Sequence, residues 1–97
     1  MASEDVFEAV EYCEPALQPG ERFPGTQETV IGEFGDEVAA VKAARAAWAA
    51  FRDAPSRDVM WWLVRRRGEP LALWIADGHS AVERVLDLTT SRLIEVE

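Results

Sequence analysis

Four short apolar runs, separated by connectors of only a few residues, fill the second half of the chain. They span residues 59–66, 71–76, 82–88 and 92–96. Each is rich in β-branched, aromatic or leucine side chains, as is typical of β-strands. Connections this short cannot carry the chain back to a parallel neighbour, so adjacent strands must be antiparallel. The sequence therefore predicts an antiparallel four-strand meander.

The alanine-rich segment 36–54 predicts the one helix. Asp36 is a natural N-cap, and Glu37 suits the positive end of the helix dipole. Alanine has the highest helix propensity of any residue, which supports a helix throughout the segment. A helical wheel gathers the bulky side chains on one stripe, which we expect to face the core. That stripe consists of Val38, Val41, Ala44, Trp48 and Phe51.

The N-terminal part carries weaker signals. Residues 28–34 read as a strand. Residues 6–13 alternate weakly, which suggests a short edge strand, with a single helical turn as the alternative. Between them, three prolines and two glycines predict a loop. We interpret residues 1–97 as one α+β domain, in which 1–27 form an acidic strand or arm plus this Pro/Gly-rich loop and 28–97 form the helix-and-sheet core. The expected order is β-α-β-β-β-β, with one long helix packed on a four- to five-strand meander.

This order of elements is similar to that of cystatin-like folds, in which the sheet curls around the helix. The similarity is one of topology only. The glutamine-valine-glycine hairpin signature of the cystatin inhibitors is missing, so the resemblance implies nothing about function.

The charges are distributed unevenly along the chain. Eighteen acidic residues outnumber ten basic ones, giving a net charge of −8. Residues 1–37 hold ten of the acids against Arg22 alone, whereas residues 42–67 hold seven bases against two acids. A strongly acidic protein repels nucleic acid and attracts basic partners. One interpretation is that the acidic N-terminal segment pairs with the basic middle.

Several classes of protein can be excluded from composition. Cys13 and His79 are the only cysteine and histidine, so the chain can form neither an internal disulfide nor a cysteine-histidine zinc site. No apolar run approaches the roughly 18 residues of a membrane span, and the N-terminus does not read as a signal peptide. We expect a cytoplasmic protein that needs no metal or cofactor and does not associate with membranes.

No catalytic residue is predicted. Asp77, His79 and Ser80 lie close together in sequence, but a tight hairpin turn does not let an imidazole bridge the other two side chains. Cys13 has acidic neighbours, which oppose formation of a thiolate. No glycine-rich phosphate loop is present. A non-enzymatic function is therefore favoured.

The tryptophans suggest a binding surface. Trp61 and Trp62 are consecutive in one strand, so they point to opposite faces of the sheet, and Trp74 lies on the next strand. Both strands are apolar on both faces, which a single helix cannot cover. We therefore expect a tryptophan-bearing sheet face with Trp62 or Trp74 as a buried anchor, the alternative being that all tryptophans belong to the core.

The run Arg65, Arg66 and Arg67 ends the first strand of the meander. With the bases of the helix it could form a basic patch beside tryptophan, the combination that single-strand nucleic-acid binders use. The net charge argues against that function. The alternative is pairing with the acidic N-terminal segment.

Three functional hypotheses follow. The leading one is a non-catalytic module that binds another protein or a second copy of itself, including an acidic inhibitor of the immunity or antitoxin kind. The second is a small-molecule-binding or enzymatic domain with an aromatic and arginine-lined cleft for an anionic aromatic ligand, and the third is nucleic-acid binding. An enclosed pocket would favour the second hypothesis and a flat aromatic patch the first. The candidate binding residues are Trp61, Trp62, Trp74, Arg65, Arg66 and Arg67.

Overall fold

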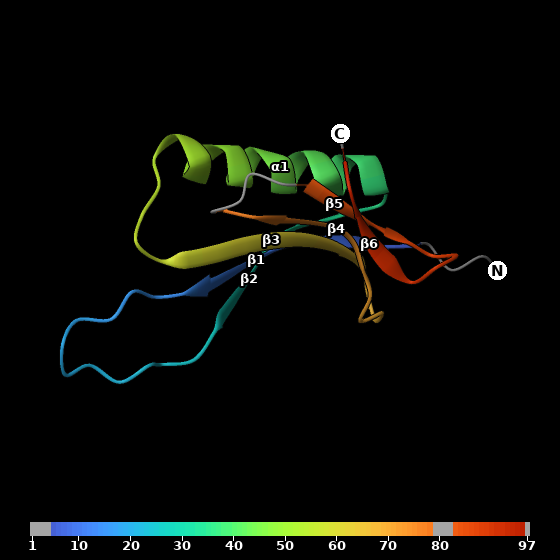
Figure 1. The fold of residues 1–97 in the computed structure, drawn as a ribbon. Helices are drawn as coiled ribbons and strands as arrows, with labels where there is room; N and C mark the ends of the chain where they lie inside the picture. Colours follow the sequence, from blue (N-terminus) through green and yellow to red (C-terminus); the bar gives the residue numbers. More distant parts are fainter. Residues whose placement is uncertain (1–4, 79–82, 97) are drawn as a thin grey trace.

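The computed structural model describes residues 5–78 and 83–96. One helix lies on one side of an antiparallel six-stranded sheet (Figure 1), which confirms the α+β class. No helix in these residues is long and apolar enough to cross a bilayer. The elements in chain order are β1 (Phe7–Glu14), β2 (Gln27–Phe34), α1 (Glu37–Asp53), β3 (Val59–Arg66), β4 (Ala72–Asp77), β5 (Glu83–Asp87) and β6 (Arg92–Glu95).

The number and order of strands differ from the sequence prediction. The prediction of four to five strands is wrong, because a β1–β2 hairpin precedes the helix. The prediction of an edge strand at the N-terminus is also wrong, since the sheet order β2-β1-β3-β4-β5-β6 places β1 between β2 and β3. Ala9 and Val10 are fully buried there. The glutamates of β1 are compatible with a central strand because Glu8 and Glu11 find partners on β3.

The helix begins as the sequence predicts. The Asp36 carboxylate accepts a hydrogen bond from the Val38 backbone N–H at 3.2 Å, which caps the first turn. Val38 itself is 60% exposed and not part of the core. The helix turns two alanines, Ala40 and Ala44, toward the sheet, and their small side chains allow its backbone to approach the sheet closely. Farther along the helix, Trp48 and Phe51 fill the space between helix and sheet. The buried positions are Ala40, Ala44, Trp48 and Phe51.

Gly78 is needed for packing. A Cβ atom at this position would lie 2.6 Å from the Phe51 ring and 3.2 Å from the Met60 carbonyl oxygen. The Gly78 N–H donates to that same oxygen at 3.0 Å. The close contact between the end of β4, the start of β3 and the helix therefore has no room for a side chain.

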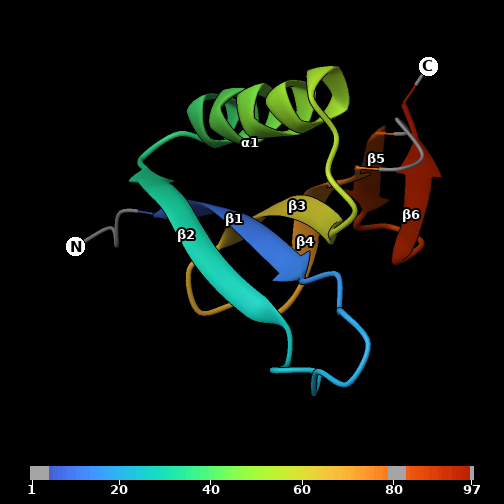
Figure 2. The same cartoon turned by 90° about the vertical axis from the view of Figure 1, so that its left-hand side faces the viewer.

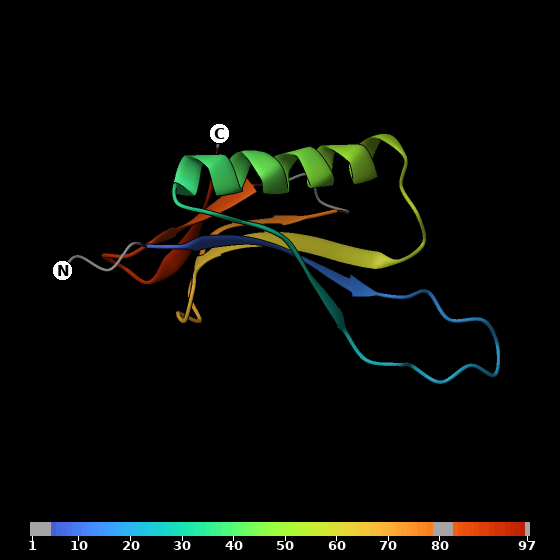
Figure 3. The same ribbon diagram turned by 180° about the vertical axis from the view of Figure 1, so that it is seen from behind.

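The helix covers only part of the sheet. Its backbone packs over β1 to β4, while β5 and β6 lie beyond it (Figure 2). Within the described residues no helix or strand packs on the opposite side of the sheet, which we call the open face. The loop that joins β1 to β2 extends away from the ends of these two strands and does not fold under the sheet (Figure 3).

The close contact between helix and sheet gives a stability prediction. Ala44→Leu adds volume at a fully buried position and should lower the free energy of unfolding by about 1–3 kcal/mol. Ala46→Leu, on the exposed side of the same helix, is the matched control and should change it by less than about 0.5 kcal/mol. Urea denaturation followed by circular dichroism measures both. Equal effects would show that the helix does not press on the sheet at Ala44.

Candidate functional site

The tryptophans divide between the two sides of the sheet. Trp62 is fully buried and Trp74 is 3% exposed, and both belong to the core beneath α1 with Trp48. The Trp62 ring lies 5.5 Å from Phe51, and its Nε1–H donates to Glu11 at 2.9 Å. Neither of the two expected anchors is available on a surface. No single cleft can be lined by both Trp61 and Trp62, because these residues point to opposite sides.

Trp61 is the tryptophan of the open face. It is half-buried and stacks on Tyr12 of β1, with ring centroids 5.4 Å apart and planes inclined by 11°. Trp61 and Tyr12 are cross-strand partners in the β1–β3 ladder. Stacking of this kind contributes about 0.5–1.5 kcal/mol beyond burial. A rigid aromatic pair therefore stands on the uncovered side of the sheet.

A row of apolar side chains crosses the open face beside this pair. The strand register pairs one residue of β2 with one of β1, that residue of β1 with one of β3, and that residue of β3 with one of β4. Cross-strand partners point to the same face, so these four side chains form a row. Farther along, Leu86 of β5 faces Leu93 of β6, which is 44% exposed. For β3 and β4, the two strands of which it was made, the prediction of apolar residues on both faces is therefore confirmed. The members of this apolar row are Val30, Val10, Leu63 and Ile75.

Arg65 covers part of the row. Its guanidinium donates to Glu8 at 3.2 Å, to the Tyr12 hydroxyl at 3.1 Å and to Glu28 at 3.1 Å. The Tyr12 hydroxyl in turn donates to Glu28 at 2.9 Å, which closes the network. Glu8 and Tyr12 flank Val10 along β1, so the arginine side chain bridges over Val10. This bridge accounts for the complete burial of a valine on an otherwise open face.

The other two arginines of the run are also paired with acidic residues. Arg66 lies 3.8 Å from Asp5 and 3.5 Å from Glu69, and its guanidinium carbon is 5.6 Å from the centre of the Phe7 ring. Arg67 forms an ion pair with Glu33. Each arginine of the run therefore has a carboxylate partner from the acidic N-terminal part, as one interpretation of the sequence expected.

The Arg65 network shifts the pKa values of its members. The hydrogen bond from the Tyr12 hydroxyl and the contacts of Arg65 lower the pKa of Glu28. Burial, followed by the bond to Glu28, raises the pKa of Tyr12. Burial opposes the charge on Arg65, but its hydrogen bonds to Glu8 and Glu28 outweigh that effect and raise its pKa. The arrangement favours a charged carboxylate, a charged guanidinium and a neutral phenol.

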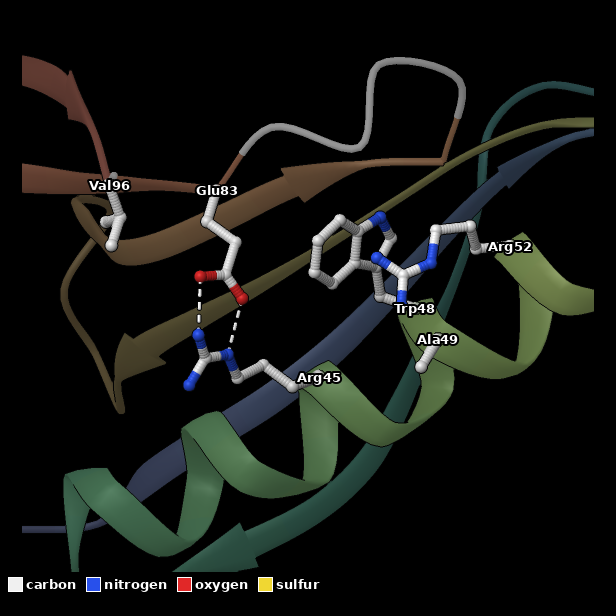
Figure 4. A pocket seen from close by; sticks show the side chains of 6 residues that line it. All are labelled: Arg45, Trp48, Ala49, Arg52, Glu83 and Val96. Atoms are coloured by element: carbon white, nitrogen blue, oxygen red, sulfur yellow. Dashed lines mark hydrogen bonds and ion pairs between the residues drawn. The ribbon is translucent and has the colours of Figure 1, made fainter.

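A cleft lies between α1 and β5, on the other side of the sheet (Figure 4). It has a volume of about 440 Å³. Arg45 donates two hydrogen bonds to the Glu83 carboxylate and so ties the helix to the sheet. The Arg52 guanidinium lies 4.9 Å from the centre of the Trp48 ring. The cleft is lined by Arg45, Trp48, Ala49, Arg52, Glu83 and Val96.

The sequence did not single out this cleft. Arg45, Trp48 and Arg52 are three or four residues apart, so they lie along one side of the helix. That spacing was visible, but the partner Glu83 lies 38 residues beyond Arg45. Only the packing of the helix across the sheet brings the two together.

The structure describes only some of the residues considered for catalysis. Asp77 and Gly78 are described, whereas His79 and Ser80 lie outside the described residues. Burial, followed by the nearby Asp58, raises the pKa of the Cys13 thiol, which disfavours a thiolate nucleophile. No group of three metal-ligating side chains converges within residues 5–78 and 83–96.

Comparison of the chain with protein-family models, with curated proteins and with solved structures finds no match. The function has to be argued from the residues themselves.

The lowered pKa of Glu28 predicts a pH-dependent stability. Its folded pKa lies below the ordinary value of 4.5, so its contribution is complete above that pH and is lost as the pH falls through the folded pKa. Glu28→Gln should lower the free energy of unfolding at pH 7 by less than about 1 kcal/mol, because the side chain is half exposed. Urea denaturation should find the difference gone near pH ~2. A difference independent of pH would contradict the network.

Removing the carboxylate partners should expose the arginines. In the variant Glu8→Gln, Glu28→Gln, Glu33→Gln, Arg65 and Arg67 lose their partners. We expect it to bind a single-stranded oligonucleotide at least about tenfold more tightly than the natural chain, with an affinity that falls steeply with salt. Fluorescence anisotropy measures both.

A matched control separates unpairing from net charge. Glu21→Gln, Glu37→Gln, Asp53→Asn removes the same amount of charge from carboxylates that form no ion pair in the described chain. This control should bind more weakly than the first variant. Equal gains would show that net charge alone keeps nucleic acid away and that the pairing is irrelevant.

Proposed function

We propose that the chain is a non-catalytic interaction domain that binds a protein with an apolar contact surface and basic margins. The apolar row on the open face is the observation that carries the proposal. One side of an antiparallel sheet can stand in water, but polar side chains usually line that side. Here four neighbouring strands each place an apolar residue on a side that no helix or strand of the described chain covers; Arg65 seals Val10, and Val30, Leu63 and Ile75 stay accessible.

The open face is large enough for a specific contact. Six strands about 4.8 Å apart give a width of about 24 Å, and four to eight residues per strand give lengths of about 13–26 Å. The flat area is therefore about 300–600 Å², before the relief of the side chains is counted. One side of a specific interface buries about 800 Å² of accessible surface. The open face is smaller than this typical area, so it suits a partner with a small contact surface.

Among the expected binding residues, Trp61 and Arg65 support the proposal most directly. Trp61 provides a rigid aromatic anchor held by Tyr12, and such residues are common among binding hot spots. Arg65 lies beside Trp61 and Leu63 on the same face of β3, and its pairing with Glu8 and Glu28 keeps its side chain over Val10. Trp62 and Trp74 hold the core and take no part in the contact.

The charge of the domain indicates a basic partner. The net charge is −8, and the arginine run that could attract an acidic partner is already paired. Complementary charges accelerate association and select between partners. Two copies of this chain would repel each other, so a homodimer is disfavoured. The cytoplasmic location and the cystatin-like curl of the sheet stay predictions, and the proposal depends on neither.

A photo-crosslinking residue tests the open face. Benzoylphenylalanine in place of Trp61 should form a covalent adduct with one basic protein in the native cell. The same residue in place of Ala46, on the exposed side of α1, is the control and should not form that adduct. Mass spectrometry identifies and quantifies the products.

A second substitution tests the apolar row itself. Leu63→Glu should abolish the adduct while circular dichroism remains unchanged, because a buried unpaired carboxylate weakens an interface by several kcal/mol, about 2–5. If Leu63→Glu unfolds, Val30→Glu replaces it, since Val30 is 42% exposed. Equal adducts from both positions, adducts between copies of the chain, or adducts unaffected by the glutamate would each overturn the proposal.

A further inference from the structure

The cleft between α1 and β5 has the chemistry of a small-molecule site. It is separate from the open face, because α1 and the open face lie on opposite sides of the sheet. Its volume of about 440 Å³ falls within the usual range of ligand pockets, about 300–1,000 Å³. Aromatic, aliphatic and charged side chains all contribute to its walls.

Among the described residues, the cleft carries one positive charge that has no carboxylate partner. Arg45 is neutralised by Glu83, whose side chain is only 12% exposed. Arg52 has a cation–π contact with Trp48 and no ion pair with any described carboxylate. Figure 4 shows its guanidinium beside the indole, on the same side of the helix as Arg45. The site therefore favours a ligand with a single negative charge.

An apolar hollow continues the cleft along the helix. It has a volume of about 200 Å³ and shares Arg45, Glu83 and Val96 with the cleft, so the Arg45–Glu83 ion pair stands between the two spaces. Its remaining walls are mainly apolar and include Val41, Leu73, Trp74 and Val85. The Trp74 Nε1–H is sealed from solvent, so it gives the hollow no donor. The hollow would take an apolar substituent of a ligand whose ring and charged group lie in the cleft.

We infer that this cleft binds a small monoanionic aromatic compound, such as an aromatic carboxylate. Arg52 receives the anionic group, in a fork geometry that matches a carboxylate. Val96 and the part of Trp48 that lines the cleft contact the ring. Trp48 is held in place by its own Nε1–H, which donates to the Asp77 carbonyl oxygen at 3.2 Å. The site is thus built on a side chain that is already fixed.

Binding of 1-naphthoate and of the uncharged 1-naphthamide tests the inference. Calorimetric titration should find the carboxylate at least about tenfold tighter than the amide, since a charge-assisted hydrogen bond is the stronger kind. The NMR signal of the Trp48 indole should shift on binding, while that of Trp62, which donates to Glu11, should not. Equal affinities, no binding of the carboxylate, or shifts at Trp62 alone would overturn the inference.

Two variants assign the roles within the cleft. Arg52→Gln should weaken 1-naphthoate at least about tenfold, whereas Arg57→Gln, which changes an exposed arginine outside the cleft, should have no effect. Glu83→Gln frees Arg45 and should shift the preference toward an aromatic dicarboxylate. Circular dichroism confirms the fold of each variant. Unchanged affinity in Arg52→Gln, or loss in Arg57→Gln, would contradict the assignment, and neither result affects the crosslinking test of the open face.

Discussion

The pairing of β1 with β3 is the interaction on which the rest of the structure depends. It runs the whole length of both strands, from Phe7 opposite Arg66 to Glu14 opposite Val59. It places an acidic strand in the middle of the sheet, where central position normally disfavours charge. The register compensates for the burial of these carboxylates, because it sets Glu8 opposite Arg65 and Glu11 opposite Trp62. Each carboxylate accepts a hydrogen bond from the residue opposite it.

The same pairing gives the two sides of the sheet different chemistry. Strand alternation sends Trp62 and Val64 toward α1, where they meet the small side chains of the helix and form a dry core. It sends Trp61, Leu63 and Arg65 to the open face. One helix can cover one side of this sheet but not both. The proposed protein contact and the proposed ligand cleft are two places where that incomplete coverage leaves apolar side chains accessible.

The fold also decides which charges of the chain are paired with each other and which remain available to a partner. In sequence, an acidic N-terminal part precedes a basic middle, and the natural question is which partner the arginines attract. In the structure Arg65 and Arg67 are committed to Glu8, Glu28 and Glu33, so the remaining excess charge is negative. The fold thereby turns a chain with a basic segment into a domain whose available charge is acidic.

The sequence by itself determined the type and approximate bounds of the helix and of the later strands, because residues 36–54 and 59–66 carry their period and caps locally. It could also show that Trp61 and Trp62 face opposite ways. Only the tertiary structure decided which tryptophan stays accessible, that β1 is central, and that Arg45 meets Glu83. These depend on contacts between segments dozens of residues apart, and such contacts are chosen by the combined packing of all elements and not by any local pattern.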